Sequence, residues 1–264
     1  MNRILKESNL FVVSPATQLY LESYSALDLH ALVRFGQWDT LLQIDIPDQP
    51  KIMFYRTAIL YGARALAFAV KNDVEQARKE YNKFESMRAY REIDGRLLHN
   101  NSVADILAAE SFMIKGEILY REKSYDLAFD ALRQAVVLED SFNYDEPWGR
   151  MQPVRHALGG LLLEQGHLDE AEEVYRCDLK YHPKNPWSLQ GLSNCLQTKK
   201  SNLEAFLVEC EVVRPKVTQS YVRTQIREVD GEFQYLKNLM KVQRDSVWAD
   251  TEIRHSCSCV GLSI

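Results

Sequence analysis

The stretch from Arg155 to Pro183 has the pattern of two short helices packed antiparallel. Large, small, aromatic and helix-ending residues stand at fixed positions along it: Leu158, Gly159, Leu162, Ala171, Tyr175 and Pro183. A small residue in each helix lets the two backbones approach, large residues fill the space beside the crossing, and proline ends the second helix. This stretch therefore predicts a helical hairpin as the building unit of the chain.

Similar helix pairs are expected along most of the chain. Apolar residues recur at helical spacing, and turn-forming or capping residues separate the runs. The expected units are Ser14–Val33 with a short helix from Trp38, Ile52–Val70 with Val74–Phe84, a pair from Ser102 in which Ser124 caps the second helix, Arg155–Pro183, and Asn185–Pro215. A last helix, Gln219–Met240, is expected to cap the open end of the stack. No β-strand pattern competes with this interpretation.

The small residues of the second helices indicate the repeat period. They are Ala77, Ala128, Ala171 and Ala205. The last two are 34 residues apart, which matches the period of about 34 residues of one kind of helix-pair repeat. The earlier alanines are more widely spaced, which indicates longer helices or inserted segments at Arg88–Asn101 and Asp140–Trp148.

Composition excludes several classes of partner. The formal net charge of −5 argues against nucleic acid, because phosphate binding needs a basic face. No apolar run reaches the roughly 18 residues that span a bilayer. Lys6, Glu7 and Asn9 leave only a short apolar patch near the N-terminus, so no signal peptide is expected. Five cysteines without framework spacing indicate reduced thiols and a cytoplasmic location.

Short motifs spread between Leu27 and Cys259 carry a family likeness. They are Arg34–Asp39, Gly116–Ile118, Tyr144–Trp148, Pro153–Gly159, Ala171-Glu172, Val174–Arg176, His182-Pro183, Asn185, Trp187–Leu189, Trp248–Asp250 and Ser256–Cys259. Together they resemble a widespread, mostly uncharacterised microbial family of tetratricopeptide repeat proteins. The chain departs from that family at Pro186, where a glycine more often follows the asparagine. The resemblance implies a helical-repeat scaffold and brings no established activity.

The resemblance also predicts which side chains face a groove, because the first helix of each pair lines the concave face of a tetratricopeptide stack. The register places Val33, Glu110 and Met113 on that face. The candidate binding residues there are His30, Arg34, Glu117, Tyr120, Arg121, His156, Glu164, Trp187, Gln190 and Asn194. Such a polar and aromatic wall suits an extended peptide or a small polar ligand. The alternative is that these residues satisfy one another on a curved surface.

One class of peptide ligand is disfavoured. Grooves that clamp the C-terminal carboxylate of chaperone tails use basic and amide side chains, whereas the matching positions here are Met113, Glu117, His156 and Gly160.

Catalysis and metal binding are the alternatives to a binding scaffold. His30, Glu117 and His156 would have to converge within about 3 Å of each other or of a substrate to act as acid and base. The chain has no glycine-rich phosphate loop, no nucleophile elbow and no close zinc spacing. The tail His255–Cys259 offers an imidazole and two thiolates to Cu(I) or Zn(II), which is half a site. No cofactor is expected.

The acidic and aromatic loop Tyr144–Trp148 has two interpretations. Asp145 and Glu146 can stand near a helix N-terminus, where the dipole favours negative charge, or pair with Arg155. In the functional alternative Trp148 covers the edge of the groove. The structural interpretation is favoured.

These observations predict an all-α fold, a tetratricopeptide-like α-solenoid of about five helix pairs plus a C-terminal capping helix. One repeat domain is expected over residues 1–245 and a tail over 246–264. The predicted function is a non-enzymatic scaffold that binds a protein or peptide, with no nucleic acid or membrane partner. The sequence does not indicate an oligomeric state.

Overall fold

The computed structural model describes residues 21–90, 95–145, 152–201, 204–205 and 207–208. The chain forms two compact units, Met1–Val154 (unit 1) and Arg155–Ile264 (unit 2). Most of the described residues are helical, as predicted, and no helix among them has the length and apolar character needed to cross a membrane. The expected capping helix and the tail lie outside the described residues, and the single domain over 1–245 stays a prediction.

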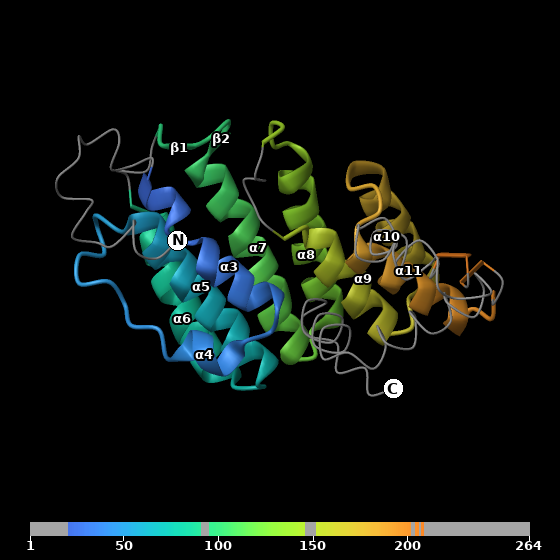
Figure 1. Cartoon of the computed structure of the whole chain (residues 1–264). Coiled ribbons are helices and arrows are strands. Elements are labelled where there is room, and N and C mark those ends of the chain that lie inside the picture. The colour runs from blue at the N-terminus through green and yellow to red at the C-terminus, as the bar shows by residue number, and fades with distance from the viewer. Residues whose placement is uncertain (1–20, 91–94, 146–151, 202–203, 206, 209–264) are drawn as a thin grey trace, which may run out of the picture. The chain divides into compact units, whose positions relative to one another are not determined.

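Three helix pairs follow one another in the described part of unit 1 (Figure 1). They are α3 (Leu27–Arg34) with α4 (Trp38–Leu42), α5 (Phe54–Val70) with α6 (Val74–Arg88), and α7 (Val103–Arg121) with α8 (Tyr125–Asp140). Within its pair, α5 packs on α6 and α7 on α8. α7 also contacts both α5 and α6, and α3 contacts α5. Each pair is therefore packed on its neighbour in chain order.

The core of unit 1 lies between these pairs. Its large, almost completely buried side chains include Leu60, Phe84, Ile106, Ile114 and Leu132. Ala77 and Ala128, which the sequence places at the helix crossings, have no exposed surface. Small residues at these points let the helix axes approach closely.

The first pair differs from its prediction at one point. The sequence predicts one continuous helix up to Val33, but a turn at Ser25 separates the helical residues 21–24 from α3. The hydroxyl and the amide of Ser25 both donate to the carbonyl of Glu22, at 2.5 and 2.9 Å, and this local bonding interrupts the helical pattern. Gly36 ends α3 as predicted, with a left-handed φ of 60° that suits glycine.

A small β-hairpin stands between α6 and α7, where the sequence predicts only a polar connection. β1 (Leu97–Leu98) pairs antiparallel with β2 (Asn101–Ser102). Each strand has two residues, which is too short for the alternation of apolar and polar residues that reveals a strand.

Polar caps begin several helices where predicted. The side chains of Asp73 and Ser102 accept hydrogen bonds from backbone N–H groups of α6 and α7, at 3.1 and 3.4 Å. Asn185 accepts two such bonds, at 3.0 and 3.4 Å, and Pro186 follows in the first turn. Ser124 precedes α8 as predicted, but its side chain makes no capping bond.

Three helices make up the main described part of unit 2. They are α9 (Val154–Glu164), whose first residue belongs to unit 1, α10 (Leu168–Tyr181) and α11 (Pro186–Thr198). The ring of Tyr175 on α10 lies against Gly159 of α9 and Gly191 of α11. A Cβ atom would lie 2.7 Å from this ring at Gly159 and 2.2 Å from it at Gly191. The sequence predicts Gly159 as a small residue that lets the helices approach, and the structure shows that the Tyr175 ring fills the space beside it.

Gly191→Ala should lower the free energy of unfolding by about 1–3 kcal/mol, because the added methyl group overlaps the Tyr175 ring. Urea denaturation followed by circular dichroism measures the change. Gln190→Ala, a half-exposed neighbour on the same helix, is the control and should change stability by less than about 0.5 kcal/mol. In a Tyr175→Leu background the cost of Gly191→Ala should be smaller. An equal cost in both backgrounds would show that the ring is not what excludes the methyl group.

Candidate functional site

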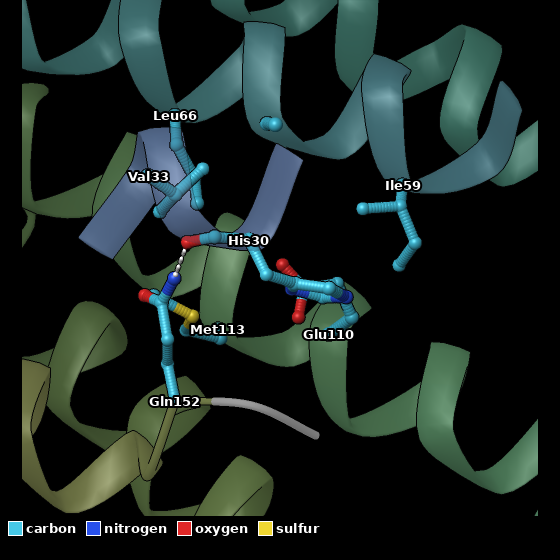
Figure 2. Close-up of a pocket in the computed structure, with 8 residues that line it drawn as sticks. His30, Val33, Ile59, Leu66, Glu110, Met113 and Gln152 are labelled. Carbon is cyan, nitrogen blue, oxygen red and sulfur yellow. Dashed lines mark hydrogen bonds between the residues drawn. The ribbon is translucent and has the colours of Figure 1, made fainter. Parts of the chain in front are cut away.

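A small cavity beneath α3 is the candidate site of unit 1. Its walls come from α3, α5 and α7 and from one residue near the end of the unit, which are brought together only by the fold (Figure 2). The lining residues are His30, Val33, Ile59, Ala63, Leu66, Glu110, Met113 and Gln152.

The cavity has an apolar floor and polar groups at its edge. The side-chain amide of Gln152 donates a hydrogen bond to the carbonyl of His30 at 2.8 Å (Figure 2). The side chains of His30 and Glu110 extend to the same cavity, and Glu110 is only 8% exposed. The centre of a water molecule has about 10 Å³ available there, close to the room that a single water needs. In this arrangement the cavity accommodates a water molecule but no peptide side chain.

Four residues that the sequence places on one concave face come together in this cavity. His30 and Val33 of α3 line it together with Glu110 and Met113 of α7. The helix α3 thus covers part of the face that the sequence predicts to be open. Arg34, at the end of α3, is half-buried.

The other three candidates on α7 make contacts within the protein. Glu117 is 1% exposed and accepts a hydrogen bond from Nε of Arg121 at 2.9 Å. Tyr120 is 4% exposed, and its ring packs edge-on against Tyr125 and Phe129, with centroid distances of 5.1 and 6.2 Å. The guanidinium of Arg121 lies over the Tyr120 ring. Glu117 and Tyr120 therefore offer almost no surface to a ligand.

In unit 2 a buried carboxylate joins three helices. Asp178 of α10 has no exposed surface. One of its oxygens lies 3.1 Å from Nε2 of His156 on α9 and accepts a hydrogen bond from the Ser188 hydroxyl of α11 at 2.5 Å. Its other oxygen lies 2.9 Å from Nδ1 of His182. This Asp178 cluster therefore links α9, α10 and α11.

The charge of the cluster follows from its hydrogen bonds. Burial by itself would raise the pKa of Asp178, but the bonds from His156 and His182 outweigh burial and hold the pKa well below its usual range. The order of the groups is not that of a catalytic triad, because the Ser188 hydroxyl donates to the carboxylate rather than to an imidazole. Ser188, Asp178 and His156 are also buried, so these three groups link the helices and have no surface that could contact a substrate.

The remaining candidates of unit 2 lie on α9 and α11. Trp187, Gln190 and Asn194 are half-buried and follow one another at a spacing that places them on one face of α11. The Trp187 ring stacks on His156 with centroids 6.4 Å apart, and the Gln190 amide donates to Asn194 at 3.0 Å. Glu164 is half-buried at the end of α9. Trp187, Gln190 and Asn194 therefore lie together on one face of α11, whereas His156 is bonded to the buried Asp178.

Asp145 anchors the β-hairpin of unit 1. Its carboxylate accepts from the side chain of Asn101 at 3.3 Å and from the backbone of Asn100 at 3.4 Å, and His99 lies 3.4 Å away. The Asn101 side chain also exchanges two hydrogen bonds with the backbone of Asn143, at 2.7 and 3.0 Å. We call this group the asparagine clasp. It gives Asp145 a structural role, and Glu146–Trp148 lie outside the described residues.

The described residues contain no group of three or more His, Cys, Asp or Glu side chains arranged to hold a metal ion. The tail His255–Cys259 lies outside them. The three residues considered for catalysis have different surroundings. His30 lines the cavity of unit 1, and Glu117 is not among the residues that line it. Glu117 is bonded to Arg121, and His156 is bonded to Asp178.

Asp178, His182 and Gln152 were not predicted from the sequence. Asp178 is on α10 and His182 directly follows that helix, four residues later, a spacing that brings side chains together and could have been recognised. No sequence pattern indicated Gln152, because it lies between helices and contacts His30, far away in the sequence, only in the folded chain.

No protein-family model matches this chain, and neither a curated protein nor a solved structure matches it.

Asp178→Asn should lower the free energy of unfolding at neutral pH by about 2–4 kcal/mol, since it removes buried charge-assisted hydrogen bonds. Because the pKa of Asp178 is lower in the folded chain, its stabilisation is present above the unfolded value of about 3.9 and is lost as the pH falls below it. The difference between parent and variant should shrink from about pH 5 to about pH 3.

Urea denaturation over this pH range measures the effect. Asp169→Asn, at a side chain that is 95% exposed, is the matched control and should change stability by less than about 1 kcal/mol. A difference between parent and Asp178→Asn that stays constant with pH would contradict a charged Asp178.

Asn101→Ala should lower the free energy of unfolding by about 1–3 kcal/mol, because it removes the hydrogen bonds that the buried Asn101 side chain makes to Asp145 and to the backbone of Asn143. Asn100→Ala is the control, since the exposed Asn100 side chain makes one bond, to the carbonyl of Tyr144 at 2.9 Å. Thermal or urea denaturation compares the two variants. An equal loss in both would remove the special role of Asn101.

Proposed function

We propose that this protein is a tetratricopeptide-like helical scaffold that binds a protein or peptide along the face made by the first helices of its pairs. The proposal includes a cytoplasmic location and no catalytic activity of its own. One observation carries it: in unit 1 the helix pairs pack in chain order, with α7 against both helices of the preceding pair. Successive packing of like hairpins is what builds an α-solenoid.

The recurring contact of a small residue with a large one supports the same architecture. Gly116 on α7 lies against Leu132 on α8, where an added Cβ would lie 2.7 Å from the leucine. Gly159 on α9 meets Tyr175 on α10 in the same way. In both cases the glycine is on the first helix and the large side chain on the second, as the repeat requires.

The chemistry of α11 favours a protein partner. Trp187, Gln190 and Asn194 form a half-buried face with an aromatic ring and two amides. Tryptophan is enriched among residues that dominate binding energy, and amides read the backbone of an extended peptide. The formal charge of −5 supports a partner other than nucleic acid.

The proposal can be tested with a photocrosslinking amino acid in place of Gln190 on the first-helix face of α11. In cells that make the protein, this position should crosslink a defined partner protein. The matched control places the same amino acid at Glu173, which is exposed on the second helix α10 of the same unit. Mass spectrometry identifies what each position captures.

The expected result is a partner captured from position 190 and not from position 173, and lost when Trp187 is changed to Ala. A hot-spot tryptophan contributes about 2 kcal/mol or more, so the loss should be about 30-fold or greater. Circular dichroism verifies that the variant is folded. The same captured proteins at both positions, or none at either, would refute binding on this face.

A further inference from the structure

Glu164, the last residue of α9, has a carboxylate oxygen that the fold covers without bonding it. The residue is half-buried, and its Oε2 atom is buried. This oxygen has no hydrogen-bond partner in the part of the chain that the structure describes. Buried polar atoms in folded proteins are almost always hydrogen-bonded, so an exception needs a physical explanation. Glu164 has the capacity to accept a hydrogen bond from a ligand.

The turns that end α9 and α11 have the same backbone geometry, which relates the residues of the two helices. Gly166 and Lys200 both have a left-handed φ, 79° and 62°. In each turn this residue donates its amide to the carbonyl three residues before it, and the next amide bonds the carbonyl five residues before that amide. Counted back from these turns, Glu164 on α9 corresponds to Thr198 on α11.

Glu164 therefore belongs to the same side of unit 2 as the α11 candidates. Residues four positions apart share one face of a helix, so Thr198 continues the row that Gln190 and Asn194 begin. His156 and Glu164 hold the positions on α9 that correspond to Gln190 and Thr198. Since α9 and α11 both pack on α10, their corresponding rows together line the first-helix face of unit 2.

The charges on this face favour a cationic ligand. The helix α11 contains no Asp, Glu, Lys or Arg, and α9 contains only Arg155 and Glu164 of these types. Arg155 is only 6% exposed. Lys199, directly after α11, lies 2.7 Å from both Asp169 and Glu172. Glu164 is therefore the half-buried charge that the first helices of unit 2 present in the described part of the chain.

We propose that Glu164 binds a basic side chain, Lys or Arg, of a peptide that crosses the first-helix face of unit 2. The ammonium or guanidinium donates a charge-assisted hydrogen bond to the carboxylate, and the amides of Gln190 and Asn194 contact the peptide beside it. Glu164 thereby selects peptides by charge, which is how charged groups at an interface give specificity. The inference rests on the proposed function, because it names the kind of peptide that this face binds.

A random-peptide phage library selected on the full-length protein tests this. Peptides whose binding is lost in Trp187→Ala belong to the first-helix face, and Lys or Arg should be enriched among them at one position. Selection on Glu164→Gln should abolish this enrichment, and selection on Glu164→Lys should replace it with Asp or Glu. Glu173→Gln, at an exposed residue of α10, is the matched control and should select the same peptides as the parent.

A selected peptide labelled with fluorescein measures the strength of the contact. By fluorescence anisotropy it should bind Glu164→Gln about tenfold more weakly than the parent, because a charge-assisted hydrogen bond is lost. With its basic residue changed to norleucine, the peptide should bind both proteins equally. Equal affinity of the unaltered peptide for both, or Trp187-dependent peptides without a basic position, would refute the inference alone. Recovery of no peptide that depends on Trp187 would refute the proposed function as well.

The free protein supplies a second test that needs no ligand. Glu164→Gln removes the charge from a buried oxygen without a hydrogen bond, so the urea midpoint should lie above that of the parent. Circular dichroism follows the denaturation and verifies that each variant used for selection is folded. A midpoint below that of the parent would show that Glu164 stabilises the folded chain itself, and would overturn its role in binding.

Discussion

The packing of this protein depends on contacts between a glycine in one helix and a large side chain in its partner. The ring of Tyr175 fills the space that Gly159 and Gly191 leave open, so three helices of unit 2 meet around one side chain. In unit 1, Leu132 fills the space beside Gly116. Such contacts leave no room for an added methyl group, and they set how closely the helix axes approach.

Buried carboxylates supply the second kind of constraint, and each has specific partners. Asp178 joins α9, α10 and α11 through two histidines and a serine, Glu22 binds Arg96, and Asp145 binds Asn101 within the asparagine clasp. A buried charge is costly unless its hydrogen bonds are satisfied, so each of these groups specifies which elements lie together. His156, which the sequence predicts to face a ligand, instead lies beside the buried Asp178.

The two units differ in how far the residues predicted to bind a ligand are covered. The α11 face of unit 2 carries an aromatic ring and two amides that are half-buried, whereas the corresponding face of unit 1 is covered by α3. α3 is short, and its Asp28 pairs with the guanidinium of Arg56 on α5 at 2.5 Å.

The sequence by itself determined the helical pairs, because helical periodicity, small residues at crossings and caps such as Asp73 and Asn185 act locally. It also identified Gly159 as a small residue needed where two helices pack, while the structure showed that Tyr175 is the ring beside it. Tertiary structure alone decided burial. Tyr120 and His156 are on first helices as predicted, yet lie inside the protein, because the α8 rings and Asp178 contact them from other helices. Glu117 is buried as well and pairs with Arg121 on its own helix. The turn at Ser25 and the cavity closed by Gln152 likewise depend on specific bonds that periodicity does not encode.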